Sequence, residues 1–170
     1  NRQSGEALTG LLGRLSEARQ ALPLPRAPVF LRVAPDLTED EVLPIVEACL
    51  TFGMDGLIVS NTTLARPSSL TSPLAGETGG LSGAPLMAAS TQVLGWFHQA
   101  AAGRLPLIGV GGIRSGADAY AKIRAGASAV QLYSALVFEG PSLIGRIRTD
   151  LAERLKADGF THVREAIGAA

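Results

Sequence analysis

The sequence has little cysteine, few aromatic residues and no excess charge of either sign. One cysteine among 170 residues excludes an internal disulfide framework and fits a reducing compartment. Lys and Arg together number 15, as do Asp and Glu, so no basic footprint for nucleic acid or an anionic membrane surface is present. No apolar run approaches the ~20 residues that a membrane-spanning helix requires. A globular domain with a hydrophobic core is therefore the expected class.

The chain begins Asn-Arg-Gln-Ser, without an initiator Met or a signal peptide, so we expect it to be a piece of a longer protein. Its cysteine, Cys49, falls on the apolar stripe of a predicted helix and is interpreted as a core residue. His98 and His162 have no partner at metal-ligand spacing, so we expect no metal site.

Strand-like and helical segments alternate along the chain. Four short apolar runs predict buried parallel strands at Val29–Ala34, Gly56–Ser60, Leu107–Val110 and Ala129–Tyr133. Alternation of this kind predicts right-handed crossovers and a parallel sheet. Four strands are half of an eight-stranded β/α (TIM) barrel, which needs about 250 residues. We expect half a barrel, and an open doubly wound sheet is the alternative.

Helix boundaries are indicated by capping residues, prolines and glycines. Ser4 is placed to cap a first helix, and Thr38 with Glu41 forms a capping box for a second. Pro44 lies about one turn inside that second helix, where it can kink it. The pattern predicts a third helix from Pro85 to Gly103, a fourth over 115–126, a fifth after Pro141 and a short one near Ala166. Leucines 8, 11, 12 and 15 mark the apolar face of the first helix, and residues 143, 144, 147, 151 and 155 that of the fifth. Six basic residues are interpreted as solvated helix faces: Lys122, Arg124, Arg146, Arg148, Arg154 and Lys156.

A glycine turn after the third predicted strand is the strongest local signal. Gly109, Gly111 and Gly112 allow backbone N–H groups to approach a ligand without Cβ atoms in the way. Ser115 then opens a helix, whose N-terminus favours an anion. The fourth strand ends at Tyr133-Ser134, beside the turn if the sheet is parallel. This arrangement predicts a phosphate site between the last two strands.

The other predicted strands also end in polar residues. Arg32 interrupts an apolar strand, either as an ion pair with the scaffold or as a cation facing an anionic ligand. The amide of Asn61 suits a planar ligand with imide or amide edges, although a simple turn explains it equally well. The segment Arg66–Pro85 is a long loop rich in Ser, Thr, Gly and Pro, which is typical of a functional or mobile loop.

With these residues in view, the chain resembles the C-terminal half of the quinone-linked, class 2 dihydroorotate dehydrogenases. The resemblance covers nearly the whole chain. Five motifs in order carry it: Ala34–Leu37, Asp55–Thr63, Glu77–Gly83, Gly109–Gly112, and Ile123–Ser128 running on to Gln131-Leu132-Tyr133.

The resemblance implies a TIM barrel that uses FMN to oxidise dihydroorotate to orotate in pyrimidine (UMP) synthesis and passes the electrons to a membrane quinone. The family usually has Lys at Arg32 and Thr at Ser60, so the flavin contact of Arg32 is the larger departure. The serine base of the family lies upstream, so we expect no catalytic base in this chain. By motif position, FMN would be bound by Arg32, Ser60, Gly83, Gly111, Gly112, Tyr133 and Ser134, and the substrate by Asn61 and Thr62.

The resemblance also implies a setting. We expect residues 1–170 to be the C-terminal half of one barrel domain whose N-terminal half is absent, and we expect a monomer. Peripheral attachment to the cytoplasmic side of a bacterial membrane would come through the missing N-terminal region, and the mitochondrial inner membrane is the alternative. The alternatives in function are another FMN- or phosphate-binding barrel, such as a dihydrouridine synthase-like enzyme, and a half-barrel that performs no chemistry. Alone, the chain is expected to bind FMN poorly and to show no turnover.

Overall fold

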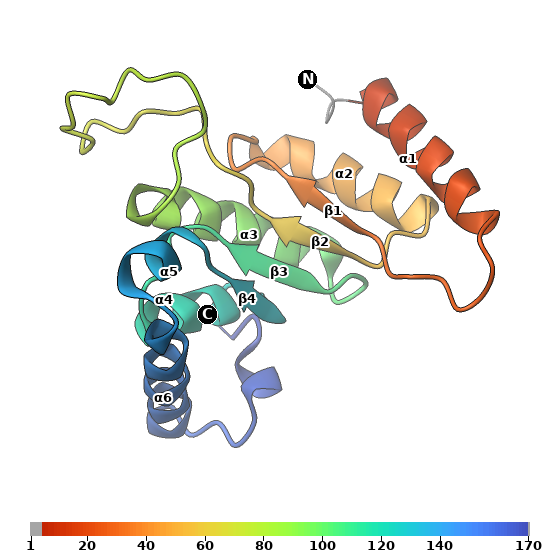
Figure 1. Cartoon of the computed structure of the whole chain (residues 1–170). Coiled ribbons are helices and arrows are strands. Elements are labelled where there is room, and N and C mark those ends of the chain that lie inside the picture. The colour runs from red at the N-terminus through yellow and green to blue at the C-terminus, as the bar shows by residue number, and fades with distance from the viewer. Residues whose placement is uncertain (1–4, 170) are drawn as a thin grey trace.

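A parallel sheet with the strand order β1-β2-β3-β4 organises the computed structural model, which describes residues 5–169 (Figure 1). The strands are β1 (Phe30–Val33), β2 (Gly56–Val59), β3 (Leu107–Val110) and β4 (Ala129–Gln131). Each strand pairs in parallel with the next strand along the chain. All four predicted strands are therefore present, within three residues of their predicted ends.

Helices connect the strands, as the alternating pattern predicted. They are α1 (Gly5–Gln20), α2 (Glu39–Thr51), α3 (Met87–Ala101), α4 (Gly116–Arg124), α5 (Ser134–Glu139) and α6 (Ser142–Ala157), with short 3₁₀ turns η1 (Ala84–Leu86) and η2 (Val163–Ala166). The predicted cap of α2 is formed, because the Thr38 N–H donates to the Glu41 carboxylate at 2.9 Å. The predicted cap Ser4 lies outside the described residues. Pro44 is exposed and α2 continues through it.

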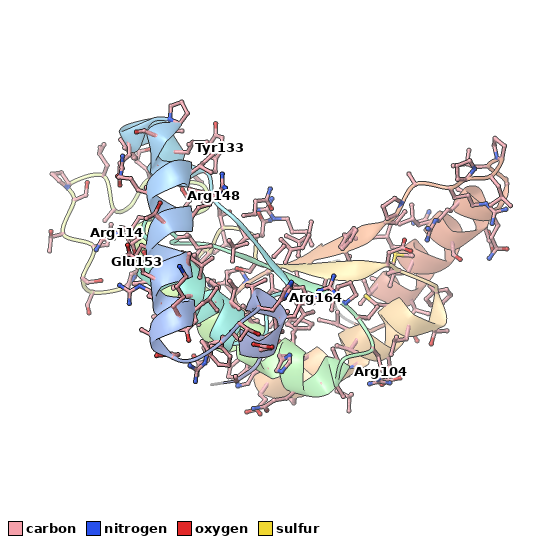
Figure 2. All side chains as sticks on the ribbon, turned by 90° about the horizontal axis from the view of Figure 1, so that it is seen from below. Arg104, Arg114, Tyr133, Arg148, Glu153 and Arg164 are labelled. Carbon is pink, nitrogen blue, oxygen red and sulfur yellow. The ribbon has the colours of Figure 1, made fainter. Side chains whose placement is uncertain are left out.

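Helices α2, α3 and α4 lie on one side of the sheet (Figures 1 and 2). Strand side chains that face these helices are fully buried, as Leu57 and Val59 show. The other face is more open: Ile58 and Ile108 are half-buried and Arg32 is exposed. An open doubly wound sheet carries helices on both faces and reverses its strand order. The fold is instead half of a β/α barrel, and its strands are buried on one face rather than on both.

The core lies between the sheet and α2 and α3. Val42, Ile45, Val46 and Cys49 of α2 are buried there, as their spacing predicted. Burial raises the pKa of the Cys49 thiol to about 11 because the thiolate loses its solvation. No helix in the described part of the chain is long and apolar enough to cross a membrane.

The buried apolar faces of α1 and α6 are narrower than their leucine and isoleucine spacing predicted. Leu8 and Leu12 of α1 are buried, whereas Leu11 and Leu15 remain 37% and 39% exposed. On α6, Ile144 is 46% exposed although it shares the apolar spacing. The reason is geometric, since α1 and α6 lie at the two ends of the layer and each packs along a single stripe (Figure 1).

The end of β4 also differs from its prediction. The strand stops at Gln131 instead of Tyr133, and helix α5 begins at Ser134. This helix was not predicted, because its six residues are too few to display a helical repeat. Gly140, at a φ of +73°, ends it.

Candidate functional site

A cavity of about 630 Å³ lies at the carboxyl ends of the strands. The loop after β2 and helix α5 lie at this end of the sheet (Figure 1). Predicted binding residues from five separate segments meet there, four of them at strand ends, because parallel strands end at the same edge. All nine predicted binding residues line the cavity: Arg32, Ser60, Asn61, Thr62, Gly83, Gly111, Gly112, Tyr133 and Ser134.

The ends of β1 and β2 form one wall of the cavity. The Nη2 atom of Arg32 donates to the Ser60 carbonyl at 3.4 Å. Ser60 is buried, and its hydroxyl donates to the Asn61 carbonyl at 3.0 Å. The N–H of Asn61 in turn donates to the Val33 carbonyl at 2.7 Å. This wall thus presents a cation and an amide side chain on a backbone that is fixed by hydrogen bonds.

Asp36 anchors the chain just beyond Asn61 and Thr62. Its carboxylate accepts hydrogen bonds from the Thr63 hydroxyl and from the Leu64 N–H. Thr63 also exchanges two backbone hydrogen bonds with Leu81, at 3.1 and 2.8 Å. No role was predicted for Asp36, although it lies inside one of the five motifs. Asp36 and Leu81 therefore hold Thr63, and with it the backbone that carries Asn61 and Thr62.

The glycine turn forms the floor of the cavity. Gly111 and Gly112 have φ values of +108° and +80°, a region that disfavours every residue with a side chain. A Cβ atom on Gly112 would lie 2.5 Å from the Cα of Met87, at the start of α3. The turn is therefore packed directly on α3, and only glycine fits at these two positions.

Residues 131–135 form the wall opposite β1. Tyr133 is 78% exposed and projects near the start of α5 (Figure 2). The hydroxyls of Ser134 and Ser82 are hydrogen bonded at 2.9 Å, which ties the long loop to the end of β4. Gly83 follows at a φ of +80°, beside Ser134. Hydroxyl groups and a glycine from the long loop and from the end of β4 thus lie together here, and such groups suit a phosphate ligand.

The N-terminus of α4, part of the predicted phosphate site, lies at the edge of the cavity. Ser115 caps α4 as expected, because its hydroxyl accepts the Asp118 N–H at 3.1 Å. The cavity, however, is lined only as far as Arg114, and Gly116 packs against Asp150 of α6. The Ser115 cap takes up the Asp118 N–H of this helix N-terminus.

The loop between β2 and η1 is organised by one arginine. The guanidinium of Arg66 donates to the carbonyls of Ala75, Glu77 and Gly79 at 2.9, 2.9 and 2.7 Å. These carbonyls lie just before Ser82 and Gly83, which line the cavity. The loop was predicted from its composition, whereas the role of Arg66 was not, since no local pattern shows which carbonyls an arginine will reach.

The prediction that Lys122 is a solvated residue is wrong. Its side chain is fully buried, and Nζ donates to the Ser90 hydroxyl at 2.6 Å. Loss of solvation lowers the pKa of Lys122 to about 7, although the nearby Asp118 carboxylate acts in the opposite direction. The missed signal was helical spacing: Ala119, Lys122 and Ile123 share one face of α4, and that face is buried. Of the other five basic residues, Arg124 is half-buried against Asp158, whereas the remainder are exposed.

A family model described as "Dihydroorotate dehydrogenase" matches residues 2–155. The chain belongs to the dihydroorotate dehydrogenase family. This membership favours the predicted resemblance over a dihydrouridine synthase-like barrel. Homologues in this family are flavoenzymes.

Relatives in the family match this chain over nearly all of its length. Proteins named dihydroorotate dehydrogenase (quinone) from Xanthobacter autotrophicus and Rhodospirillum rubrum are 54% and 56% identical to it, over 98% of the chain in each case. A crystal structure of ligand-free dihydroorotate dehydrogenase from Eimeria tenella superposes with a TM-score of 0.92 at 37% identity, covering 98% of this chain and 50% of that one. The chain spans 47% and 46% of the two bacterial relatives, about half their length, and corresponds to their C-terminal half.

Proposed function

We propose that this chain forms the flavin-binding half of an enzyme that oxidises dihydroorotate to orotate and uses a quinone as electron acceptor. The observation that carries the proposal is the convergence of all nine predicted residues on one cavity. Family membership and the names of the bacterial relatives support the same reaction. The product of this reaction, orotate, is a pyrimidine, so we assign the reaction to pyrimidine synthesis.

The residues of the cavity fit FMN. The Gly111–Gly112 turn and the Tyr133-Ser134 segment offer backbone N–H and hydroxyl donors for a terminal phosphate. Gly83, at positive φ, leaves room for close approach beside Ser134. Arg32 and Ser60 lie on the opposite wall, where a planar ring system would be held. Bound FMN would supply the electron-accepting ring and pass the electrons on to the quinone.

Arg32 is assigned to charge stabilisation. A flavin ring gains negative charge when it is reduced, and a cation beside it lowers the free energy of the reduced form. The bond from Arg32 to the Ser60 carbonyl holds one side of the guanidinium and orients its plane. Arginine keeps the charge of the lysine usual in the family and adds further donors in a fixed fork.

Asn61 and Thr62 are assigned to the substrate. An amide side chain both donates and accepts, which matches the alternating N–H and C=O groups of a pyrimidine ring. Asp36 and Leu81 hold the following residue, Thr63, so the pair is oriented before substrate arrives. No residue of this chain is assigned as the base, so these side chains bind and orient rather than remove a proton.

The setting of the enzyme is proposed from the same family. A quinone acceptor implies attachment to the membrane that holds it. We place the protein at the cytoplasmic side of a bacterial membrane, bound peripherally, because the two bacterial relatives carry the quinone name. We also propose that it is a monomer. The mitochondrial inner membrane is the corresponding location in a eukaryote.

The test uses a hybrid in which the upstream half of the Rhodospirillum rubrum relative precedes this chain. We expect the hybrid to reduce a quinone in the presence of dihydroorotate and to bind orotate. Asn61→Ala should weaken orotate binding about tenfold or more, because ring polar groups lose their partner. Gln99→Ala, which removes an exposed amide on α3, is the control. A folded hybrid that does not bind orotate, or an Asn61→Ala variant with undiminished affinity, would contradict the proposal.

A further inference from the structure

Lys122 and Ser90 form a buried polar pair directly behind the glycine turn. Both side chains are fully buried, Lys122 on α4 and Ser90 on α3. The lysine ammonium donates to the serine hydroxyl at 2.6 Å. That hydroxyl lies 2.7 Å from the Leu86 carbonyl and 3.1 Å from the Gly111 carbonyl, and it can donate to either. A short chain of hydrogen bonds therefore links the lysine to the turn.

The pair supports the turn from the side opposite the cavity. A Cβ atom on Gly111 would lie 2.8 Å from the Ser90 hydroxyl, so this part of the turn rests on the serine. A Cβ atom on Gly109 would lie 3.3 Å from the Cβ of Lys122. Gly111 and Gly112 also line the cavity. The turn thus separates the Lys122–Ser90 pair from the predicted phosphate position by little more than its own backbone.

The charged groups that the structure places around Lys122 do not form an ion pair with its ammonium. Asp118 lies one turn earlier on α4, and its carboxylate accepts from the Ser115 hydroxyl and the Arg114 N–H. In α3 the ionisable residue is His98, near Gly126, and β3 and β4 contain none. On α6, Asp150 faces Gly116 and pairs with Arg154. Lys122 forms no ion pair within residues 5–169, and a buried ammonium without one is costly.

We propose that Lys122 is a positioning residue for the phosphate group of the ligand. Through Ser90 it fixes the Gly111–Gly112 turn, and its ammonium is the counter-charge for a phosphate dianion bound on the cavity side of that turn. This inference rests on the proposed flavin site and adds to it a residue that does not touch the ligand.

The proposal couples phosphate binding to the protonation of Lys122. Without a bound anion, burial holds the pKa of Lys122 at about 7. A dianion bound on the cavity side of the turn favours the charged form and raises that pKa. Binding above pH 7 therefore takes up a proton, and the affinity for a phosphate ligand falls as pH rises above 7. A phosphate ester has its second pKa near 6, so its own ionisation is already largely complete in this range.

The chain contains two lysines, Lys122 and Lys156, which makes a direct measurement possible. With lysine labelled at Cε, NMR follows the titration of each one, and exposed Lys156 serves as the internal control. We expect excess FMN to move the Lys122 midpoint upward by a full pH unit or more. Riboflavin, which lacks the phosphate, should leave it unchanged, and inorganic phosphate should move it in the same direction as FMN. An identical Lys122 midpoint with and without FMN would overturn the proposal.

Variants give an independent readout. Lys122→Met should weaken FMN binding about tenfold at pH 7, because a hydrogen bond to a charged group and a counter-charge are lost. Riboflavin binding should change little, and Lys156→Met should change neither. Ser90→Ala removes the link to the turn and should show the same selectivity for FMN. Equal weakening of FMN and riboflavin, or no weakening, would show a structural role only and contradict the inference.

The same titrations separate this inference from the proposed function. If the native chain shows no interaction with FMN at millimolar concentration, the flavin site itself is wrong. If it binds FMN and the Lys122 variants bind equally well, the flavin site stands and the role of Lys122 is wrong.

Discussion

Lys122 loses its contact with water on folding, and this loss decides its protonation chemistry. A lysine on an exposed helix face stays charged to high pH, whereas Lys122 has a pKa of about 7 because it is buried. Burial disfavours the charged form of Cys49 as well. Its charged form is the deprotonated one, so the pKa of the thiol rises, to about 11. The sequence identified Cys49 as a core residue from its apolar neighbours. It did not identify Lys122, because a charged side chain on an otherwise buried helix face was interpreted from its type rather than its position.

The shifted pKa of Lys122 predicts how stability depends on pH. In the unfolded chain Lys122 titrates near 10.5, and in the folded chain near 7. Between these values the unfolded chain holds the extra proton, so the free energy of unfolding should rise from pH 7 to pH 10.5. Below pH 7 the cost of burying the ammonium is fully present. Lys122→Met should abolish this rise and stabilise the chain at pH 7 by roughly 2–4 kcal/mol.

Urea unfolding of the native chain and of Lys122→Met at pH 6.5 and pH 9 measures this effect. Lys156→Met, which removes an exposed lysine, should behave as the native chain does. A Lys122→Met variant with the native pH dependence would show that another group is responsible.

Among the elements, the loop between β2 and η1 depends most on a single side chain. Arg66 reaches carbonyls from Ala75 to Gly79, and Ser82 then bonds Ser134 across the cavity. Local patterns predicted β3 to the residue, because a short apolar run between turn signals has few alternatives. They missed α5 and the role of Arg66, since both depend on contacts with segments distant in the sequence. The glycine turn was predicted because its conformation depends on local residues, whereas the phosphate role of the α4 N-terminus stays a prediction.

Arg66→Ala should loosen this loop without unfolding the sheet. We expect faster amide hydrogen exchange over residues 74–83 and a loss of FMN affinity of about fivefold, equivalent to roughly 1 kcal/mol. The midpoint of thermal unfolding should change little, because Arg66 is exposed. Arg148→Ala, on the exposed face of α6 (Figure 2), is the matched control. Unchanged exchange in the loop would mean that Arg66 does not order it.

Viewed as a whole, the molecule is a half-barrel with the proposed binding residues on one rim. The helix-facing side of the sheet is closed by α2, α3 and α4, and the opposite side carries exposed groups such as Arg32 and Gln131. Phe138 and Val137 of α5 are 86% and 63% exposed beside the cavity. Half of the relatives' length lies outside the match to this chain. The cavity therefore has the chain's own residues on its floor and two walls, and FMN binding by the chain alone should be weak.

The central claim is that these walls and this floor form a flavin phosphate site. A two-dimensional NMR titration of the labelled chain with FMN tests it directly, because weak binding still shifts the amide signals of contacting residues. We predict shifts at Gly83, Gly111, Gly112 and Ser134, with riboflavin shifting the last three far less. Shifts confined to other surfaces such as α6, or the same pattern for FMN and riboflavin at the glycine turn, would contradict the account.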